Sequence, residues 1–237
     1  MHLSYSKIKT YLSCPLKFKF AYIDRIPQKP KTYFRFSHII HATLSRYHFY
    51  KKKSLEDLLT FYDEAFRSSR EKSERLYQEG KKILINFYHD FRDSIPYRVE
   101  KKFKVKIGPH ILSGKIDRVD KVNGGYELID YKVAKNILSL EEIRENLQLK
   151  IYSTGFYKLT KIVPLRAGFY YLRHREKFYT VPTEEDIHDT IKLIYSVAGK
   201  IRGGNFLPNE GKACKMCDYK DKCFSMRICE INSYLVI

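Results

Sequence analysis

Three charged residues, Asp117, Asp130 and Lys132, fall within a short stretch that reads GKIDRVDKVNGGYELIDYKV and covers residues 114–133. Apolar and polar residues alternate on both sides of the Asn-Gly-Gly sequence at 123–125, which predicts two strands joined by a tight turn. Because successive side chains of a strand point to opposite faces, Asp130 and Lys132 share one face. Carboxylates gathered in this way are suited to binding a divalent cation.

The register of the predicted hairpin decides which charged residues face one another. If Val122 pairs with Gly125, Asp117 lies opposite Asp130; if the two-residue loop begins one residue later, Asp117 lies opposite Lys132. Either register puts two carboxylates and one ammonium on the same face. Neighbouring carboxylates repel each other unless a cation lies between them, so the pattern indicates a divalent-cation site. Ordinary charges on a solvated strand face are the alternative.

Length and charge restrict the class of protein. The chain has 237 residues, of which 45 are Lys or Arg and 27 are Asp or Glu, so its formal net charge is +18. Such an excess favours a polyanionic partner, and nucleic acid is preferred over a membrane because no basic amphipathic membrane-surface helix is evident. A solvated lysine-rich surface is the alternative. No apolar run long enough for a transmembrane helix and no secretory signal is found, so we expect a cytoplasmic protein without a membrane partner.

Five cysteines are unevenly distributed, with one near the start of the chain and four near its end. Clustering of this kind in an intracellular protein indicates metal binding rather than disulfides. Cys214, Cys217 and Cys223 supply three regularly spaced thiols. A fourth ligand could be Cys229, which would make a local zinc site, or Cys14, which would join the two ends of the chain.

The hydrophobic periodicity predicts the elements that must position these residues. Helices are expected at 4–23 (broken near Cys14-Pro15), 37–50, 55–93, 140–158 and 184–202, and strands at 98–107, 111–122, 126–133, 165–173 and 177–181. This order predicts an α/β (α+β) fold with a mixed sheet and a helical N-terminal part.

Further polar residues fall on elements next to the hairpin. Glu100 lies at the start of the preceding strand, and Gln148 and Tyr152 are four residues apart, hence on one helix face. His41 lies in the helix at 37–50, where a histidine among apolar residues is more often a packing residue than a ligand.

The order of these motifs resembles the PD-(D/E)XK nuclease superfamily, and within it the RecB-like branch. The resemblance is carried by Gly114-x-x-Asp117, Asp130-Tyr131-Lys132 and Gln148-x-x-x-Tyr152, together with the N-terminal sequence SYSKIKTYLSCPLKFKFAYI. The cysteine set is similar to that of AddB-type nuclease domains and of the small CRISPR-associated RecB-like exonucleases. The resemblance implies a restriction-endonuclease-like core with a mixed central sheet.

The resemblance also implies roles for the polar residues. Asp117, Asp130 and His41 would bind Mg²⁺ or Mn²⁺, and the backbone carbonyl of Tyr131 would be a further ligand. Lys132 would orient the attacking water and offset the charge of the transition state. The softer assignments, as groups that orient substrate or water, are Glu100, Gln148 and Tyr152.

The cysteines would hold an iron–sulfur cluster, since Cys14 with Cys214, Cys217 and Cys223 resembles the four ligands of a [4Fe–4S] centre. On this interpretation Cys229 is a free thiol. The expected layout is a single nuclease domain at 1–237, with a helical front or insertion at 37–95, a nuclease core at 98–202 and an iron–sulfur module formed by Cys14 and residues 214–223.

The function implied is that of a metal-dependent DNA exonuclease. Relatives prefer single-stranded DNA, many digest it from the 5′ end, and they act in CRISPR spacer acquisition or in DNA recombination and repair. Protein partners would then be CRISPR adaptation integrase proteins or recombination helicases. Aromatic and cationic residues that alternate at 17–22 and 46–53 are suited to single strands. The alternative is a non-catalytic DNA-binding subunit with a structural metal site.

Overall fold

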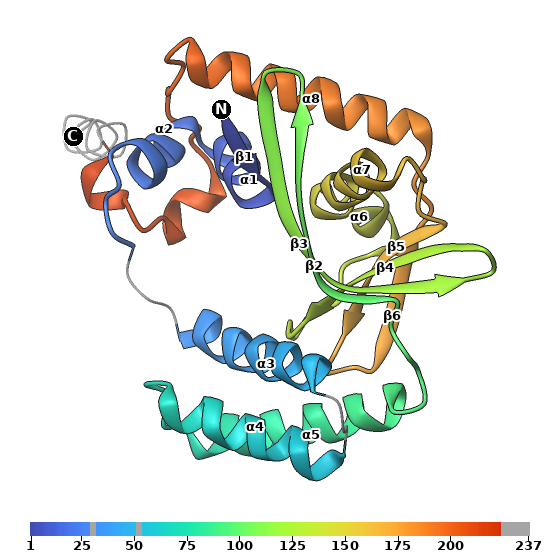
Figure 1. The fold of residues 1–237 in the computed structure, drawn as a ribbon. Coiled ribbons are helices and arrows are strands. Elements are labelled where there is room, and N and C mark those ends of the chain that lie inside the picture. Colours follow the sequence, from blue (N-terminus) through green and yellow to red (C-terminus); the bar gives the residue numbers. More distant parts are fainter. Residues whose placement is uncertain (29–31, 51–53, 224–237) are drawn as a thin grey trace. The chain divides into compact units, whose positions relative to one another are not determined.

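The computed structural model describes residues 1–28, 32–50 and 54–223, with side chains from residue 35 onward in the second range (Figure 1). The chain divides into two compact units. We call Pro30–Val105 with Ser113–Thr190 the central unit, and Met1–Lys29 with Lys106–Leu112 and Ile191–Ile237 the terminal unit. Among the helices of the described ranges, none is both long and apolar enough to cross a membrane.

A mixed β-sheet runs through the chain, as the sequence predicts. Its strands are β1 (His2–Ser4), β2 (Arg98–Ile107), β3 (His110–Val122), β4 (Gly125–Lys132), β5 (Arg166–Tyr171) and β6 (Glu176–Thr180). Their order is β1-β3-β4-β5-β6, and β2 also pairs with β3. The β3–β4 and β5–β6 pairs are antiparallel, whereas β4 and β5 are parallel. Strand β1 was not predicted, because three residues are too few to show a period of two.

The β3–β4 hairpin adopts the first of the two registers considered above. Val122 pairs with Gly125, and the pairing continues to Arg118 and Ile129. The loop residues Asn123 and Gly124 have φ angles of 46° and 78°. Positive φ at both loop positions is what a two-residue turn needs to match the twist of its strands, and Asn-Gly adopts it readily. The pairing ends one residue before Asp117 and Asp130, the two carboxylates that this register was expected to place opposite each other.

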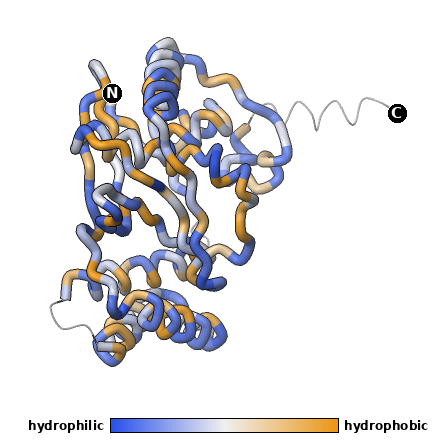
Figure 2. The backbone as a smooth tube through the Cα atoms, turned by 90° about the vertical axis from the view of Figure 1, so that its right-hand side faces the viewer, coloured by the Kyte–Doolittle hydropathy of each residue, from blue (hydrophilic) through white to orange (hydrophobic). Residues whose placement is uncertain are grey.

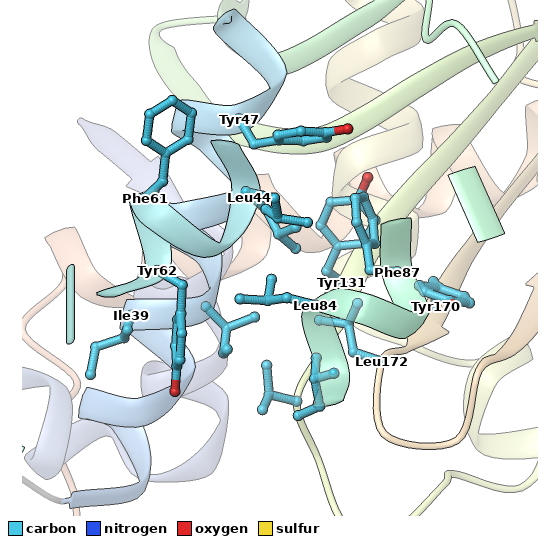
Figure 3. Packing of buried hydrophobic residues seen from close by; sticks show 14 of the residues in the cluster. Ile39, Leu44, Tyr47, Phe61, Tyr62, Leu84, Phe87, Tyr131, Tyr170 and Leu172 are labelled. Carbon is cyan, nitrogen blue, oxygen red and sulfur yellow. The ribbon is translucent and has the colours of Figure 1, made fainter. Parts of the chain in front are cut away.

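Three helices form one layer of the central unit: α3 (Thr32–Phe49), α4 (Leu55–Ser68) and α5 (Glu74–Phe91). The segment predicted as helical at 55–93 is thus two helices, since Ser73 caps the start of α5. Hydrophilic and hydrophobic residues alternate along these helices, at the bottom of Figure 2. Their apolar faces pack together and against Tyr131, Tyr170 and Leu172 of the sheet region (Figure 3).

A second pair of helices, α6 (Leu140–Arg144) and α7 (Leu147–Thr160), connects β4 to β5. The single helix predicted at 140–158 was wrong, because α6 ends at Arg144, with Glu145 as its C-cap, and Asn146 caps the start of α7. The ring of Phe103, in β2, packs against Gly114 of β3 and Gly155 of α7. A Cβ at either glycine would lie 2.4 Å from the ring. The glycine of the Gly114-x-x-Asp117 motif therefore leaves room for this contact.

The terminal unit contains short helical segments. They are α1 (Tyr5–Ser13), α2 (Pro15–Phe18), the π-helix η1 (Lys19–Ile23) and the 3₁₀ turns η2 (Lys212–Met216) and η3 (Lys220–Lys222). Ser4 caps α1, and the chain breaks at Cys14, whose backbone is extended, as the Cys14-Pro15 pair predicts. Helix α8 (Glu184–Arg202) begins in the central unit and ends in the terminal unit.

Candidate active site

Asp117 and Asp130 are both buried, with 4% and 6% of their surface exposed. The Asp117 Oδ2 atom accepts a hydrogen bond of 2.9 Å from the backbone N–H of Tyr131. His41 Nδ1 lies 3.5 Å from the same oxygen. The hairpin and helix α3 thus bring one predicted carboxylate and the predicted histidine together.

Asp130 is the centre of a second set of contacts. Its Oδ2 atom is 2.6 Å from Lys132 Nζ, and its Oδ1 atom accepts a 2.8 Å hydrogen bond from Gln148 Nε2. Lys132 Nζ in turn donates to Gln148 Oε1 over 2.7 Å. Gln148 Nε2 also lies 3.0 Å from the hydroxyl of Tyr152. The two residues predicted on one face of α7 therefore face the hairpin, and the side-chain amide bridges its carboxylate and its ammonium.

Burial shifts the pKa values of Asp117 and His41. Loss of solvent and the neighbouring charge of Asp130 raise the pKa of Asp117 well above its usual value, although the Tyr131 N–H opposes this. Burial lowers the pKa of His41, against the attraction of Asp130. A neutral imidazole and a carboxylate that lacks solvation are both suited to a cation ligand.

Glu100 reaches the same neighbourhood from β2. It forms an ion pair with Lys115 of β3, and its charge acts on both Asp117 and His41. Its φ of 50° lies in the left-handed region, which is unusual for glutamate and frequent at functional sites. Lys115 was not singled out from the sequence, since only the pairing of β2 with β3 brings it to Glu100.

The donor set is appropriate for Mg²⁺ or Mn²⁺, because it offers carboxylate oxygens and one imidazole in a buried position. In the geometry of the described residues, however, no three His, Cys, Asp or Glu side chains gather as a metal-binding group. Asp117 is engaged by Tyr131, and Asp130 by Lys132 and Gln148. The predicted ligands are neighbours that are bonded to other protein groups.

The predicted cysteines line one pocket of the terminal unit, although no three of the described ones are gathered as a metal-binding group. Cys14, Cys214, Cys217 and Cys223 all line it, together with Asn209. The Cys14 Sγ atom lies 3.4 Å from the Lys17 backbone nitrogen and 3.5 Å from that of Asn209. Backbone N–H groups directed at sulfur stabilise thiolate charge, which is appropriate for a cluster ligand. Cys229 lies outside the described residues.

Two buried residues beside the site were not predicted. His48 has 9% and Arg118 1% of its surface exposed, and both belong to the central unit. His48 follows His41 by seven residues, a spacing that places both on one face of a helix and could have indicated a second histidine at the same site. Arg118, in contrast, is one of many basic residues in the sequence, and only its burial distinguishes it.

Comparison with known proteins identifies the family. The family model described as the PD-(D/E)XK nuclease superfamily matches residues 2–224. No curated protein matches the chain. One similar solved structure, "Crystal structure of SSO0001", is 12% identical, with a TM-score of 0.48, and the match covers 94% of this chain and 85% of that one.

Proposed function

This chain belongs to the PD-(D/E)XK nuclease superfamily, and we propose that it is a metal-dependent exonuclease that acts on DNA. The observation that carries the proposal is the bonded cluster of Asp130, Lys132 and Gln148, with Asp117 adjacent on the hairpin. A solvated, merely charged strand face would not bury both carboxylates. The prediction of a single nuclease domain over 1–237 is part of this proposal.

The cation would be held by Asp117, Asp130 and His41, with the carbonyl of Tyr131 as a further ligand. When bound, Mg²⁺ or Mn²⁺ would polarise the scissile phosphate and favour hydroxide over water. The raised pKa of Asp117 supports this assignment, because a cation would relieve the repulsion that burial and Asp130 impose on it.

Lys132 would hold the attacking water and offset negative charge on the phosphate. Its ammonium is fixed between Asp130 Oδ2 and Gln148 Oε1, so it is oriented before substrate arrives. Gln148 would hold the Asp130 carboxylate and the Lys132 ammonium in fixed positions. The Tyr152 hydroxyl would in turn fix the Gln148 amide. Glu100 would orient substrate or water from strand β2.

We further propose that Cys14, Cys214, Cys217 and Cys223 hold a [4Fe–4S] cluster. Their shared pocket and the N–H groups near Cys14 Sγ support this assignment. The cluster would be structural, since it would join the start of the chain to its end. Anaerobic purification should give a brown protein with about four iron and four sulfide per chain; a colourless protein with stoichiometric zinc would refute the cluster.

The substrate proposed is single-stranded DNA, degraded from the 5′ end in CRISPR spacer acquisition or in recombination and repair. The net charge of +18 supports a polyanionic substrate. Integrase proteins of CRISPR adaptation or recombination helicases would be the protein partners, in the cytoplasm. Residues 51–53, the lysines that end the segment predicted to suit single strands at 46–53, lie outside the described residues.

The test uses single-stranded DNA labelled at the 5′ end in one reaction and at the 3′ end in another, with Mn²⁺. Digestion from the 5′ end would release short labelled products at once from the first substrate and a shrinking ladder from the second. A duplex of the same sequence measures the strand preference.

Two controls show whether cleavage belongs to the proposed site. EDTA and the Asp130→Ala variant should each abolish it. Asp93→Ala, which removes an exposed carboxylate of the same unit, should cleave like the natural protein. DNA binding without cleavage would instead favour the alternative function, a non-catalytic DNA-binding subunit.

A further inference from the structure

Helix α3 presents two histidines to one tyrosine of the sheet. His41 and His48 are seven residues apart, about two helical turns, so both lie on the same helix face. Their ring centroids are 6.5 Å and 6.2 Å from that of Tyr131. The His48 ring stacks on the tyrosine at an interplanar angle of 15°, and its Nε2 atom lies 3.2 Å from the tyrosine hydroxyl.

The Tyr131 side chain is fixed from every direction that the contacts describe. It is 2% exposed, and Phe87 of α5 meets it edge to face at 5.4 Å (Figure 3). The Tyr131 hydroxyl and His48 Nε2 form one buried hydrogen bond, and the tautomer of His48 decides which of the two donates.

The backbone of the same tyrosine contacts one of the proposed cation ligands, Asp117. The Tyr131 N–H donates to Asp117 Oδ2, and His41 Nδ1 lies close to that oxygen. A closed ring of contacts therefore runs from His41 through Asp117 and Tyr131 to His48, and back along α3. Fixing the tyrosine ring fixes the peptide that orients Asp117.

We propose that His48 is a positioning residue: it holds Tyr131, and through the Tyr131 peptide it keeps Asp117 and His41 in the geometry that binds the catalytic cation. This inference rests on the proposed function. If His48 were only a packing residue, its replacement would lower stability and leave cation affinity unchanged. Outer groups that orient metal ligands typically change affinity or activity by about 10- to 100-fold when they are replaced.

The experiment compares His48→Phe, Tyr131→Phe and the double variant. His48→Phe keeps an aromatic ring but removes the ring nitrogens, and Tyr131→Phe removes only the phenol oxygen. Each is titrated with Mn²⁺ by calorimetry and then assayed for kcat and KM on single-stranded DNA. We expect Mn²⁺ affinity to fall about tenfold and kcat to fall with it in each single variant. The double variant should be no worse than either, because both changes break one contact.

Two further variants separate positioning from packing. Tyr62→Phe removes a buried hydroxyl in the same core, which bonds to Leu76 and Tyr77 of α5 and not to the sheet. It should lower the melting temperature without changing Mn²⁺ affinity. His48→Gln, which keeps a hydrogen-bonding group near the phenol, should recover part of the affinity that His48→Phe loses.

The outcomes distinguish this inference from the proposed function. Natural protein that neither binds Mn²⁺ nor cleaves DNA would reject the proposed function and the inference with it. Natural protein that cleaves, while His48→Phe and Tyr131→Phe bind Mn²⁺ as tightly as it does, would reject the inference alone. If His48→Phe does not fold, the comparison of Tyr131→Phe with Tyr62→Phe decides.

Discussion

The two candidate sites of this chain are built in different ways. The hairpin site lies on regular strands and a helix of the central unit, its carboxylates are buried, and they are hydrogen-bonded to other members of the site. The cysteine pocket of the terminal unit is lined by short helical segments (α1, α2, η1 and two 3₁₀ turns) and a loop, and its four thiols are half-buried.

The two sites therefore depend on different kinds of support. Strand register and helix packing orient the hairpin residues, so the fold itself specifies that geometry. Short 3₁₀ turns bury little surface and add little stability, so the proposed cluster would stabilise the cysteine pocket by linking its thiols. Changes in the hairpin should therefore impair chemistry before stability, and changes in the cysteines should impair stability first.

The largest effect is expected for Lys132→Ala. The change removes the ammonium that lies 2.6 Å from Asp130 Oδ2, and kcat should fall about 10³-fold, since fixed charges at a reacting centre contribute at that scale. Circular dichroism should stay unchanged, because the side chain is 28% exposed and not part of the core. Lys150→Ala, which removes a lysine paired with Glu145 on the surface, is the control. Cleavage at the natural rate by Lys132→Ala would remove this residue from the mechanism.

Cys14→Ser tests the opposite behaviour in the cysteine pocket. Loss of one cluster ligand should release the iron and lower the free energy of unfolding by about 3 kcal/mol, the scale of a cross-link that closes a very long loop. Iron and sulfide assays with anaerobic urea denaturation measure both quantities. Cys229→Ser should leave both unchanged. The reverse result, with Cys229 required and Cys14 dispensable, would favour a local zinc site.

Gly114→Ala tests whether packing of α7 positions the hairpin site. The new Cβ would lie 2.4 Å from the buried ring of Phe103, so we expect a loss of about 2 kcal/mol in stability and a larger relative loss of activity. Thermal denaturation and the cleavage assay measure the two effects. At Gly199 in α8 a Cβ meets open space, so Gly199→Ala should stabilise the protein slightly. Natural stability in Gly114→Ala would mean that Phe103 can move aside.

The sequence predicted the features that depend on neighbouring residues. Alternation and an Asn-Gly turn specify the β3–β4 hairpin, and the broken helix at Cys14 follows from the proline after it. The division between α6 and α7 was missed, because an asparagine inside an apolar pattern resembles an ordinary helix residue until its side chain is seen to cap.

The candidate site was predictable only in part, for a related reason. Gln148 and Tyr152 were found through their spacing on one helix, whereas Lys115 and His48 depend on which elements pack together. No local pattern states that β2 pairs with β3 or that α3 lies beside Tyr131. The role of Cys14 came from a family resemblance, since a partner about 200 residues away has no local signal.

The smallest of these changes in stability is expected for Asp117→Asn, which should separate stability from chemistry in the hairpin. The folded protein holds the Asp117 proton to higher pH than the unfolded chain does. Stability in EDTA should therefore fall as pH rises above about 4 and through the raised pKa. Asn accepts the Tyr131 N–H without a charge, so the variant should be more stable than the natural protein at pH 7 by about 1 kcal/mol, and inactive.

The control is Asp120→Asn, which breaks the ion pair with buried Arg118 and should lose stability instead. Urea denaturation at pH 5 and pH 8, with and without Mn²⁺, measures this: Mn²⁺ should stabilise only chains that keep Asp117. Equal stability of Asp117→Asn and the natural protein at both pH values would mean that the carboxylate carries no penalty for a cation to relieve.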